Sequence, residues 1–234
     1  MKSTQNNRDR ENIFIGNGEM AGLMRSFDWS QTSLAAVETW SQSLKTTLNI
    51  LLTSGHPMLL FWGEDLIQFY NDAFRPSLGA DRHPQGLGCK AKEFWHHAWH
   101  IVGKQIDTVM TQGKFVWNED YLVPIVRNGN LEEVYWTYSY SPVRDDSGNI
   151  KGVLVVCTET TKRVISERQL KTQRELATQV IGVKSVEQAC EVSAGTLANN
   201  PDDVPFALLY VLDENQTSAQ QSHRGNESPH DGAK

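Results

Sequence analysis

The order of strands and helices between Pro57 and Thr158 is the feature of this sequence that most limits its fold. The strands expected from short apolar runs bounded by turn residues are, in chain order, Met58–Trp62, Asp65–Tyr70, 115–125, 132–141 and 150–156. Helical patterns at 73–78 and 91–112 lie between the second and third of them. The Asn-Gly pair within 127–130 predicts a hairpin turn, because these residues tolerate positive φ. The pattern predicts an α+β fold, a five-stranded antiparallel sheet with helices on one side.

The rest of the chain is expected to add helices on either side of this domain. Apolar spacing predicts helix between Glu19 and Thr53, with Ser33 as an N-cap. A charged linker helix is expected from residue 161 and ends at Gly182. The predicted division is a disordered N-terminus (1–17), an N-terminal helical segment (18–56), the central domain (57–160), a linker helix (161–182), an incomplete second domain (183–214) and a disordered tail (215–234).

Composition excludes several classes of function. The formal net charge is −6 and the pI is about 5.6, which argues against a nucleic-acid or anionic-membrane partner bound through bulk charge. The 3 cysteines form no C-x-x-C pair, so neither a disulfide framework nor a zinc ribbon is expected. No apolar run approaches the ~20 residues of a membrane-spanning helix. A cytoplasmic setting is expected.

Two stretches of the sequence resemble the PAS family. Phe69–Gly79 contains the aromatic-x-Asn-x-Ala-aromatic pattern found where the second PAS strand enters the first helix. Glu159-Thr160-Thr161 stands where PAS domains carry an Asp-Ile-Thr signature that passes the signal into the following helix. Residues 185–214 are similar to the opening of a GAF domain, a helix followed by a strand.

Gly18–Trp29 and Glu133–Arg144 look like a bacterial subgroup in which a PAS domain precedes a GAF domain in sensor histidine kinases. The resemblance therefore implies the sensory region of a two-component kinase. Glu159, Thr160 and Thr161 would relay the signal. A homodimer through the N-terminal and linker helices is implied, with kinase domains further along a longer protein. No phosphoacceptor helix or ATP-binding pattern is found in the sequence, so no catalysis is expected of this chain alone.

Aromatic side chains are concentrated in the PAS-like region, which holds 15 of the 21 in the chain. They suit a densely packed core, and this interpretation is favoured. The alternative is a cavity for a small-molecule ligand, the kind of site in which PAS domains bind haem, flavin or metabolites. The residues expected to line it are Trp62, Phe69, Asn71, Phe94, Trp99, Tyr121 and Tyr138.

A histidine cluster and one cysteine raise the question of a cofactor. His96 and His100 would share a helix face, and His97 or His100 would be the axial ligand in a haem- or metal-binding redox or gas sensor, the alternative function. Cys89 lacks the Asn-Cys-Arg-Phe-Leu-Gln string of light-sensing PAS domains, so a flavin adduct is not expected. Core or exposed histidines are commoner than ligands, and the expectation is no cofactor.

Overall fold

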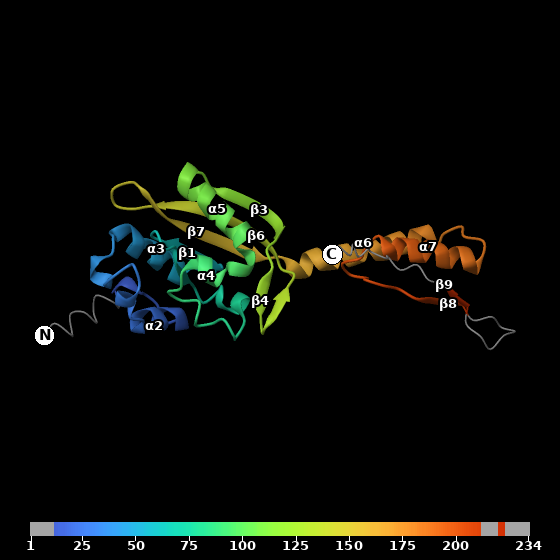
Figure 1. The fold of residues 1–234 in the computed structure, drawn as a ribbon, viewed down its shortest axis with the longest axis horizontal. Helices are drawn as coiled ribbons and strands as arrows, with labels where there is room; N and C mark the ends of the chain where they lie inside the picture. Colours follow the sequence, from blue (N-terminus) through green and yellow to red (C-terminus); the bar gives the residue numbers. More distant parts are fainter. Residues whose placement is uncertain (1–11, 212–219, 223–234) are drawn as a thin grey trace, which may run out of the picture. The chain divides into compact units, whose positions relative to one another are not determined.

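The computed structural model describes residues 12–211 and 220–222, which form two compact units. The first unit runs to Thr161 and the second begins at Lys162. Figure 1 labels their elements along the chain. Each unit is considered by itself.

A five-stranded antiparallel sheet forms the centre of the first unit. Its spatial order is β2-β1-β7-β6-β3. The strands are β1 (Met58–Trp62), β2 (Ile67–Tyr70), β3 (Val116–Leu122), β6 (Tyr135–Arg144) and β7 (Ile150–Glu159). β7 lies between β1 and β6, and its valines Val153 and Val155 are buried, as the apolar run at 150–156 predicts. The predicted α+β class and antiparallel sheet are confirmed.

The strand predicted over residues 115–125 ends at Leu122 instead. Pro124 has no N–H with which to continue the ladder, and the chain turns away from the sheet. The next residues form a separate ribbon of β4 (Ile125–Arg127) and β5 (Asn130–Glu132). The predicted turn does lie between them, with φ of 50° at Asn128 and 77° at Gly129.

One face of the sheet is covered by the segment between β2 and β3. It contains η3 (Arg75–Leu78), α4 (Ala91–Phe94), η4 (His96–Ala98) and α5 (Trp99–Gln112). The continuous helix predicted over 91–112 is therefore wrong. The backbone leaves helical geometry at Trp95 (ψ 22°) and Ala98 (φ −115°), so His96 and His100 do not share one regular helix.

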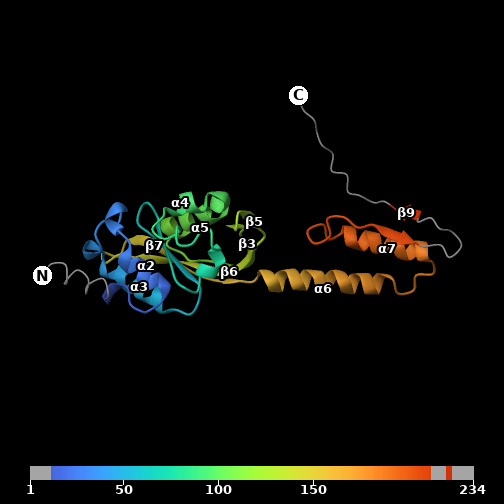
Figure 2. The same cartoon turned by 90° about the horizontal axis from the view of Figure 1, so that it is seen from below.

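The N-terminal helices cover the opposite face of the same sheet (Figure 2). They are α2 (Glu19–Ser26), η1 (Trp29–Gln31), η2 (Val37–Thr39) and α3 (Gln42–Thr53). Trp29 stacks on Phe69 of β2 with ring centroids 4.8 Å apart. The helices between β2 and β3 lie on one side of the sheet, as predicted. The helices before β1 form a second layer on the other side.

Two predictions for the N-terminal region are wrong in detail. α3 begins at Gln42, and its N-cap is Ser41, whose hydroxyl accepts a hydrogen bond from the Leu44 N–H (3.3 Å), not Ser33. Residues before 18 are not all disordered, because Phe14 is fully buried against Trp29 and Trp40. Burial of an aromatic ring orders this stretch. Residues 1–11 lie outside the described part of the chain.

The second unit contains α6, α7 (Val186–Ala198), β8 (Leu209–Val211) and β9 (Gln220–Ser222). α6 (Thr161–Gln179) begins two residues after β7 and ends before Gly182, whose φ is +83°. Arg168 forms a two-pronged ion pair with Asp203, with N···O distances of 2.8 and 2.7 Å. The predicted helix at 185–197 is present, but the predicted strand at 206–212 is shorter, and the tail includes β9. The other residues of the tail lie outside the described residues.

Replacing Trp29 by alanine is expected to destabilise the first unit by about 3–5 kcal/mol, because the fully buried indole leaves a cavity over Phe69. The matched control is Trp117→Ala. Its side chain is 58% exposed, and its loss should change stability by no more than about 0.5 kcal/mol. Urea unfolding of the full chain, followed by circular dichroism, measures both. Equal effects would mean that the N-terminal layer does not stabilise the sheet.

Candidate functional site

A cavity of about 40 Å³ lies between the sheet and the segment that contains α4 and α5. Side chains from β1, β4, β6, β7 and α5 converge on it. The lining residues are Leu59, Phe61, Phe74, Trp95, Val102, Val123, Ile125, Trp136, Tyr138, Tyr140, Val155 and Cys157. The lining is almost entirely apolar, which suits a small molecule or part of one.

No group on the cavity wall carries a charge at neutral pH. Burial raises the pKa of Tyr138 to about 12 and that of Tyr140 well above its usual range. Burial, followed by the charge of Glu159, raises the pKa of the Cys157 thiol to about 12. A polar group in the cavity wall is the Tyr138 hydroxyl, which accepts a hydrogen bond from the Gln105 side-chain amide (2.6 Å). Such a wall is chemically suited to an apolar ligand, and its Tyr and Cys side chains stay protonated, so none of them is an activated nucleophile or general base.

Among the seven residues predicted to line a cavity, Tyr138 is the one found in the cavity wall. The register of β1 with β2 turns Phe69 to the other face, against Trp29, and Trp62 likewise points away from Phe61. Phe94 lies beneath the Arg82 guanidinium (3.9 Å to the ring centroid). That any of these residues contacts a ligand stays a prediction.

Asn71, Trp99 and Tyr121 also lie elsewhere. Asn71 is fully buried and bonds to backbone groups, Trp99 packs over Gly103, and Tyr121 is 42% exposed at the edge strand. The cavity residues that the prediction missed include Trp136 and Tyr140. They alternate with Tyr138 along β6, and this two-residue period was the signal that could have found them.

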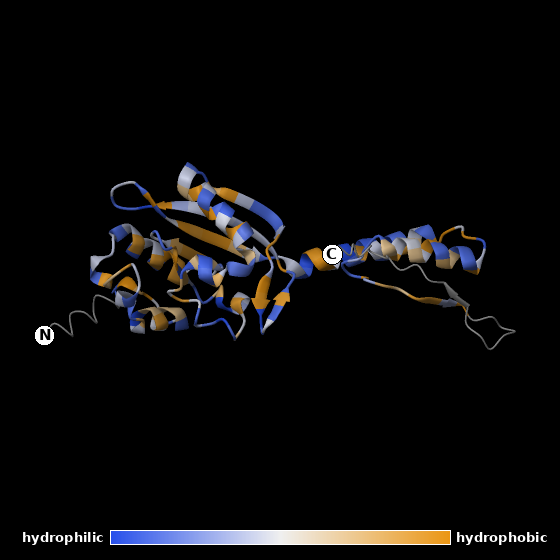
Figure 3. Ribbon diagram, in the orientation of Figure 1, coloured by the Kyte–Doolittle hydropathy of each residue, from blue (hydrophilic) through white to orange (hydrophobic). Residues whose placement is uncertain are grey.

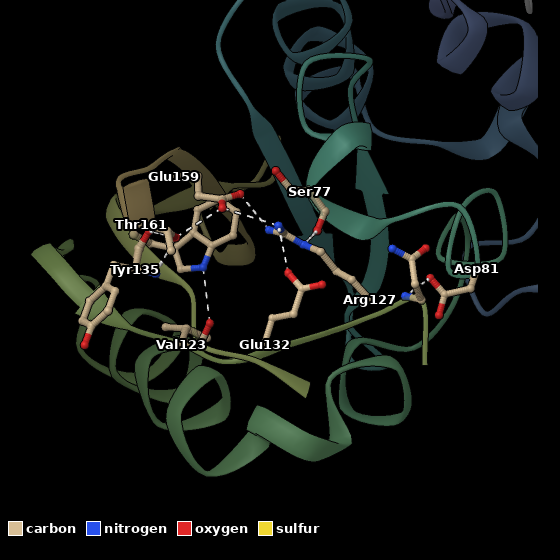
Figure 4. A network of polar contacts seen from close by, with 10 residues as sticks. Ser77, Asp81, Val123, Arg127, Glu132, Tyr135, Glu159 and Thr161 are labelled. Atoms are coloured by element: carbon tan, nitrogen blue, oxygen red, sulfur yellow. Dashed lines mark hydrogen bonds and ion pairs between the residues drawn. The ribbon is translucent and has the colours of Figure 1, made fainter. Parts of the chain in front are cut away.

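A second cluster of polar contacts surrounds Arg127 at the end of β4 (Figure 4). The Arg127 Nε donates to the carbonyl of Ser77 (2.8 Å), and its Nη2 donates to Glu159 Oε2 (2.7 Å). A weaker ion pair joins Nη1 to Glu132 (3.5 Å). The Arg127 side chain is only 14% exposed, whereas the carboxylates of Glu159 and Glu132 are 32% and 41% exposed, so water reaches the ion pairs from the carboxylate side.

The residues after Arg127 are fixed to the loop before α4. The carboxylate of Asp81 accepts hydrogen bonds from the backbone N–H groups of Asn128 (2.9 Å) and Gly129 (3.2 Å). These bonds lower the pKa of Asp81. The turn between β4 and β5 is thereby held in one position.

The same cluster contains the first residue of α6. The Thr161 hydroxyl bonds to Glu159 Oε1 (3.2 Å) and accepts from the Tyr135 N–H (3.0 Å), while the Thr160 N–H donates to the Tyr135 carbonyl (2.8 Å). The predicted relay residues Glu159, Thr160 and Thr161 therefore lie together. No pattern in the sequence predicted a contact for Arg127, the β4 residue that binds Glu159.

The apolar cavity and the cluster around Arg127 are both built on strands β4, β6 and β7. Ile125 lines the cavity and lies two residues before Arg127 on β4. Trp136 lines the cavity, pairs with Glu159 in the register of β6 and β7, and donates its indole N–H to the Val123 carbonyl (3.3 Å). Ile125 and Trp136 therefore lie in the cavity wall and next to the residues of the Arg127 cluster.

His97 is partly buried, and burial, followed by the charges of Arg82 and His96, lowers its pKa to about 4. The ring is neutral near pH 7. His96 bonds to the Glu93 carbonyl (3.1 Å), and His100 is exposed. In the described part of the chain, no three His, Cys, Asp or Glu side chains lie close enough to hold a metal ion. Haem or metal ligation by His97 or His100 stays a prediction.

Comparison with known proteins defines the class of this fold. Residues 53–165 match the model of a family described as the PAS fold. This segment of the chain is a PAS-fold domain. The match ends at residue 165, so a GAF domain beginning at 183 stays a prediction. No curated protein matches the sequence, and no helix of the described residues is both long and apolar enough to cross a membrane.

Solved structures similar to this chain include PAS proteins from several bacteria. The sensory box sensor histidine kinase from Vibrio cholerae is 15% identical over 50% of this chain and 86% of its own, with a TM-score of 0.34. The PAS domain of a protein from Colwellia psychrerythraea is 15% identical over 51% and 98%, with a TM-score of 0.38. The Rhodobacter sphaeroides LOV protein is 14% identical over 66% and 90%, with a TM-score of 0.42.

The stability of the first unit should fall as the pH drops from about 6.5 towards 4. In that range the unfolded chain protonates His97, whereas the folded chain keeps the ring neutral, so protonation favours unfolding. Above pH 6.5, His97 is neutral in both the folded and the unfolded chain, so it no longer makes stability depend on pH. His97→Gln should flatten this part of a stability–pH curve measured by urea unfolding. His100→Gln, at an exposed position, should leave it as steep as in the wild type.

Proposed function

We propose that this chain is the sensory part of a two-component histidine kinase, in which the PAS domain responds to a small molecule in the apolar cavity. The response is relayed through Arg127, Glu159 and Thr161 to the linker helix α6. Kinase domains elsewhere in a longer protein carry out phosphoryl transfer, and this chain has a regulatory role. No prosthetic group is needed for this function, and a cavity of about 40 Å³ suits a small ligand better than a haem or a flavin.

The observation that carries the proposal is the position of Arg127. Its side chain joins a strand of the cavity wall to the carboxylate at the end of β7, and that carboxylate contacts the first residue of α6. A ligand that binds better to one arrangement of β4 than to another would shift the population of the two arrangements. The contacts of Glu159 and Thr161 would then change together.

We further propose a cytoplasmic homodimer. The three cysteines are all free thiols, which suits a reducing compartment. α3 packs Leu44, Leu48 and Leu51 within its own unit, so the linker helix, where Leu170 is 44% exposed, is the better candidate for the contact between copies.

The test replaces Arg127 with glutamine, with Arg144→Gln as the matched control. Arg144 donates to the Gly148 carbonyl at the exposed far end of β6. Loss of the Arg127 contacts should speed hydrogen exchange at the Thr160 and Tyr135 amides by about tenfold, the effect of one charge-assisted hydrogen bond, whereas the control should leave it unchanged.

A second experiment tests function: residues 1–182 are fused to the dimerisation and catalytic domains of a well-understood histidine kinase. Autophosphorylation of the fusion should change with Arg127→Gln and not with Arg144→Gln. If exchange at Thr160 rises while autophosphorylation stays at the wild-type level, the cluster is structural and the relay is wrong. An unchanged exchange rate would contradict the role of Arg127 itself.

A further inference from the structure

The polar groups in the wall of the apolar cavity are already paired within the protein. The indole N–H of Trp95 donates to a side-chain oxygen of Gln68 (2.6 Å). The indole N–H of Trp136 and the thiol of Cys157 each donate to a backbone carbonyl, at 3.3 and 3.7 Å. The structure describes every lining residue, and none of them has a buried side-chain nitrogen or oxygen without a hydrogen-bond partner. A ligand therefore finds no unpaired buried polar atom in this wall.

The tyrosines of β6 do not add a binding group of another kind. The hydroxyl oxygen of Tyr138 accepts from Gln105, and burial keeps both Tyr138 and Tyr140 uncharged near neutral pH. A ligand that carried a hydroxyl or an amide against this wall would give up hydrogen bonds to water and form none in exchange. The loss of affinity is about tenfold for one neutral polar group and larger for a charged one.

The volume of the cavity limits a ligand to a few atoms. About 40 Å³ is little more than the ~30 Å³ that one water molecule occupies in the liquid, and about a quarter of an apolar cavity of ~150 Å³ that binds benzene. The wall is also closely packed, because Phe61, Phe74 and Trp136 are each at most 4% exposed. A larger ligand would have to displace these buried rings.

We propose that this cavity binds a neutral, apolar molecule of about two or three non-hydrogen atoms, the chemical class of the short hydrocarbons. The inference rests on the proposed ligand-sensing role of the cavity, and it names the chemical class of the ligand. Alcohols, carboxylates and phosphates are excluded by the paired wall. The dissociation constant is expected to be about 1 mM or weaker, since a small ligand gains a limited free energy per non-hydrogen atom.

Such a ligand would touch side chains on both sides of the cavity. Leu59 and Val155 reach it from the sheet, and Val102 reaches it from α5. Ile125 of β4, two residues before Arg127, belongs to the same wall. Dispersion contacts on all sides favour the arrangement in which these side chains close around the ligand.

The test titrates the full-length chain with ethane under pressure, methanol and benzene, and follows methyl groups by NMR. Ethane should shift the methyl signals of Leu59, Val102 and Val155. It should not shift those of Leu60, which is fully buried on the opposite face of β1. Methanol has as many non-hydrogen atoms as ethane and should bind at least about tenfold more weakly, because its hydroxyl finds no partner.

Each other outcome overturns a stated part of the inference. Methanol binding as tight as that of ethane would overturn the apolar class and leave the ligand-sensing role of the cavity standing. Benzene binding tighter than that of ethane would overturn the size limit in the same way. If none of the three probes binds, both this inference and the ligand-sensing role are wrong.

Val155→Ile adds one carbon atom to the cavity wall and should weaken ethane binding at least about fivefold, because the added carbon takes up much of the space. The matched control is Val116→Ile, a partly buried valine of β3 outside the wall, which should leave ethane binding unchanged. Should Val155→Ile fail to fold, Val102→Ile fills the cavity from α5 instead. Ethane binding that is equal in a folded filling variant and the wild type would place ethane elsewhere and overturn the inference.

Discussion

The amide of Asn71 is the contact on which the arrangement of the first unit depends. Its Nδ2 donates to the carbonyls of Leu51, Ser54 and His56, at 3.1, 3.2 and 2.7 Å. Its Oδ1 accepts from the N–H groups of Met58 and Phe74, both at 3.0 Å. One fully buried side chain thus satisfies the end of α3, the start of β1 and the turn after β2.

This position of β1 decides which side chains meet the cavity. With Met58 held by Asn71, Leu59 and Phe61 face α5 and line the cavity, while Leu60 faces the N-terminal helices with its partner Phe69. The lining of the cavity and the contact with the N-terminal layer therefore both depend on the register of one strand. A shift by a single residue would exchange the two faces.

The sequence predicted the sheet because strand periodicity and the Asn-Gly turn are local signals. It failed where tertiary packing decided the outcome. Nothing local to residues 91–112 showed the break at Trp95, whose indole N–H bonds to Gln68 across the fold (2.6 Å). Trp62 and Phe69 lie outside the cavity wall because an aromatic side chain on a strand can point to either face of the sheet, and the register of β1 with β2 decides which face. Glu159 and Thr161 were found through their motif, whereas Arg127 contacts Ser77 and Glu159, which are 50 and 32 residues away in the sequence.

The stacking of Trp29 on Phe69 has a practical consequence for where this protein can be cut. The PAS match begins at residue 53, the last residue of α3, and so omits every residue that covers the outer face of β1 and β2. A fragment trimmed to those limits would leave Leu60 and Phe69 facing water. Recombinant pieces and domain-swapped chimaeras should keep the chain from at least Ile13, because the shared family segment is shorter than the part that must fold together.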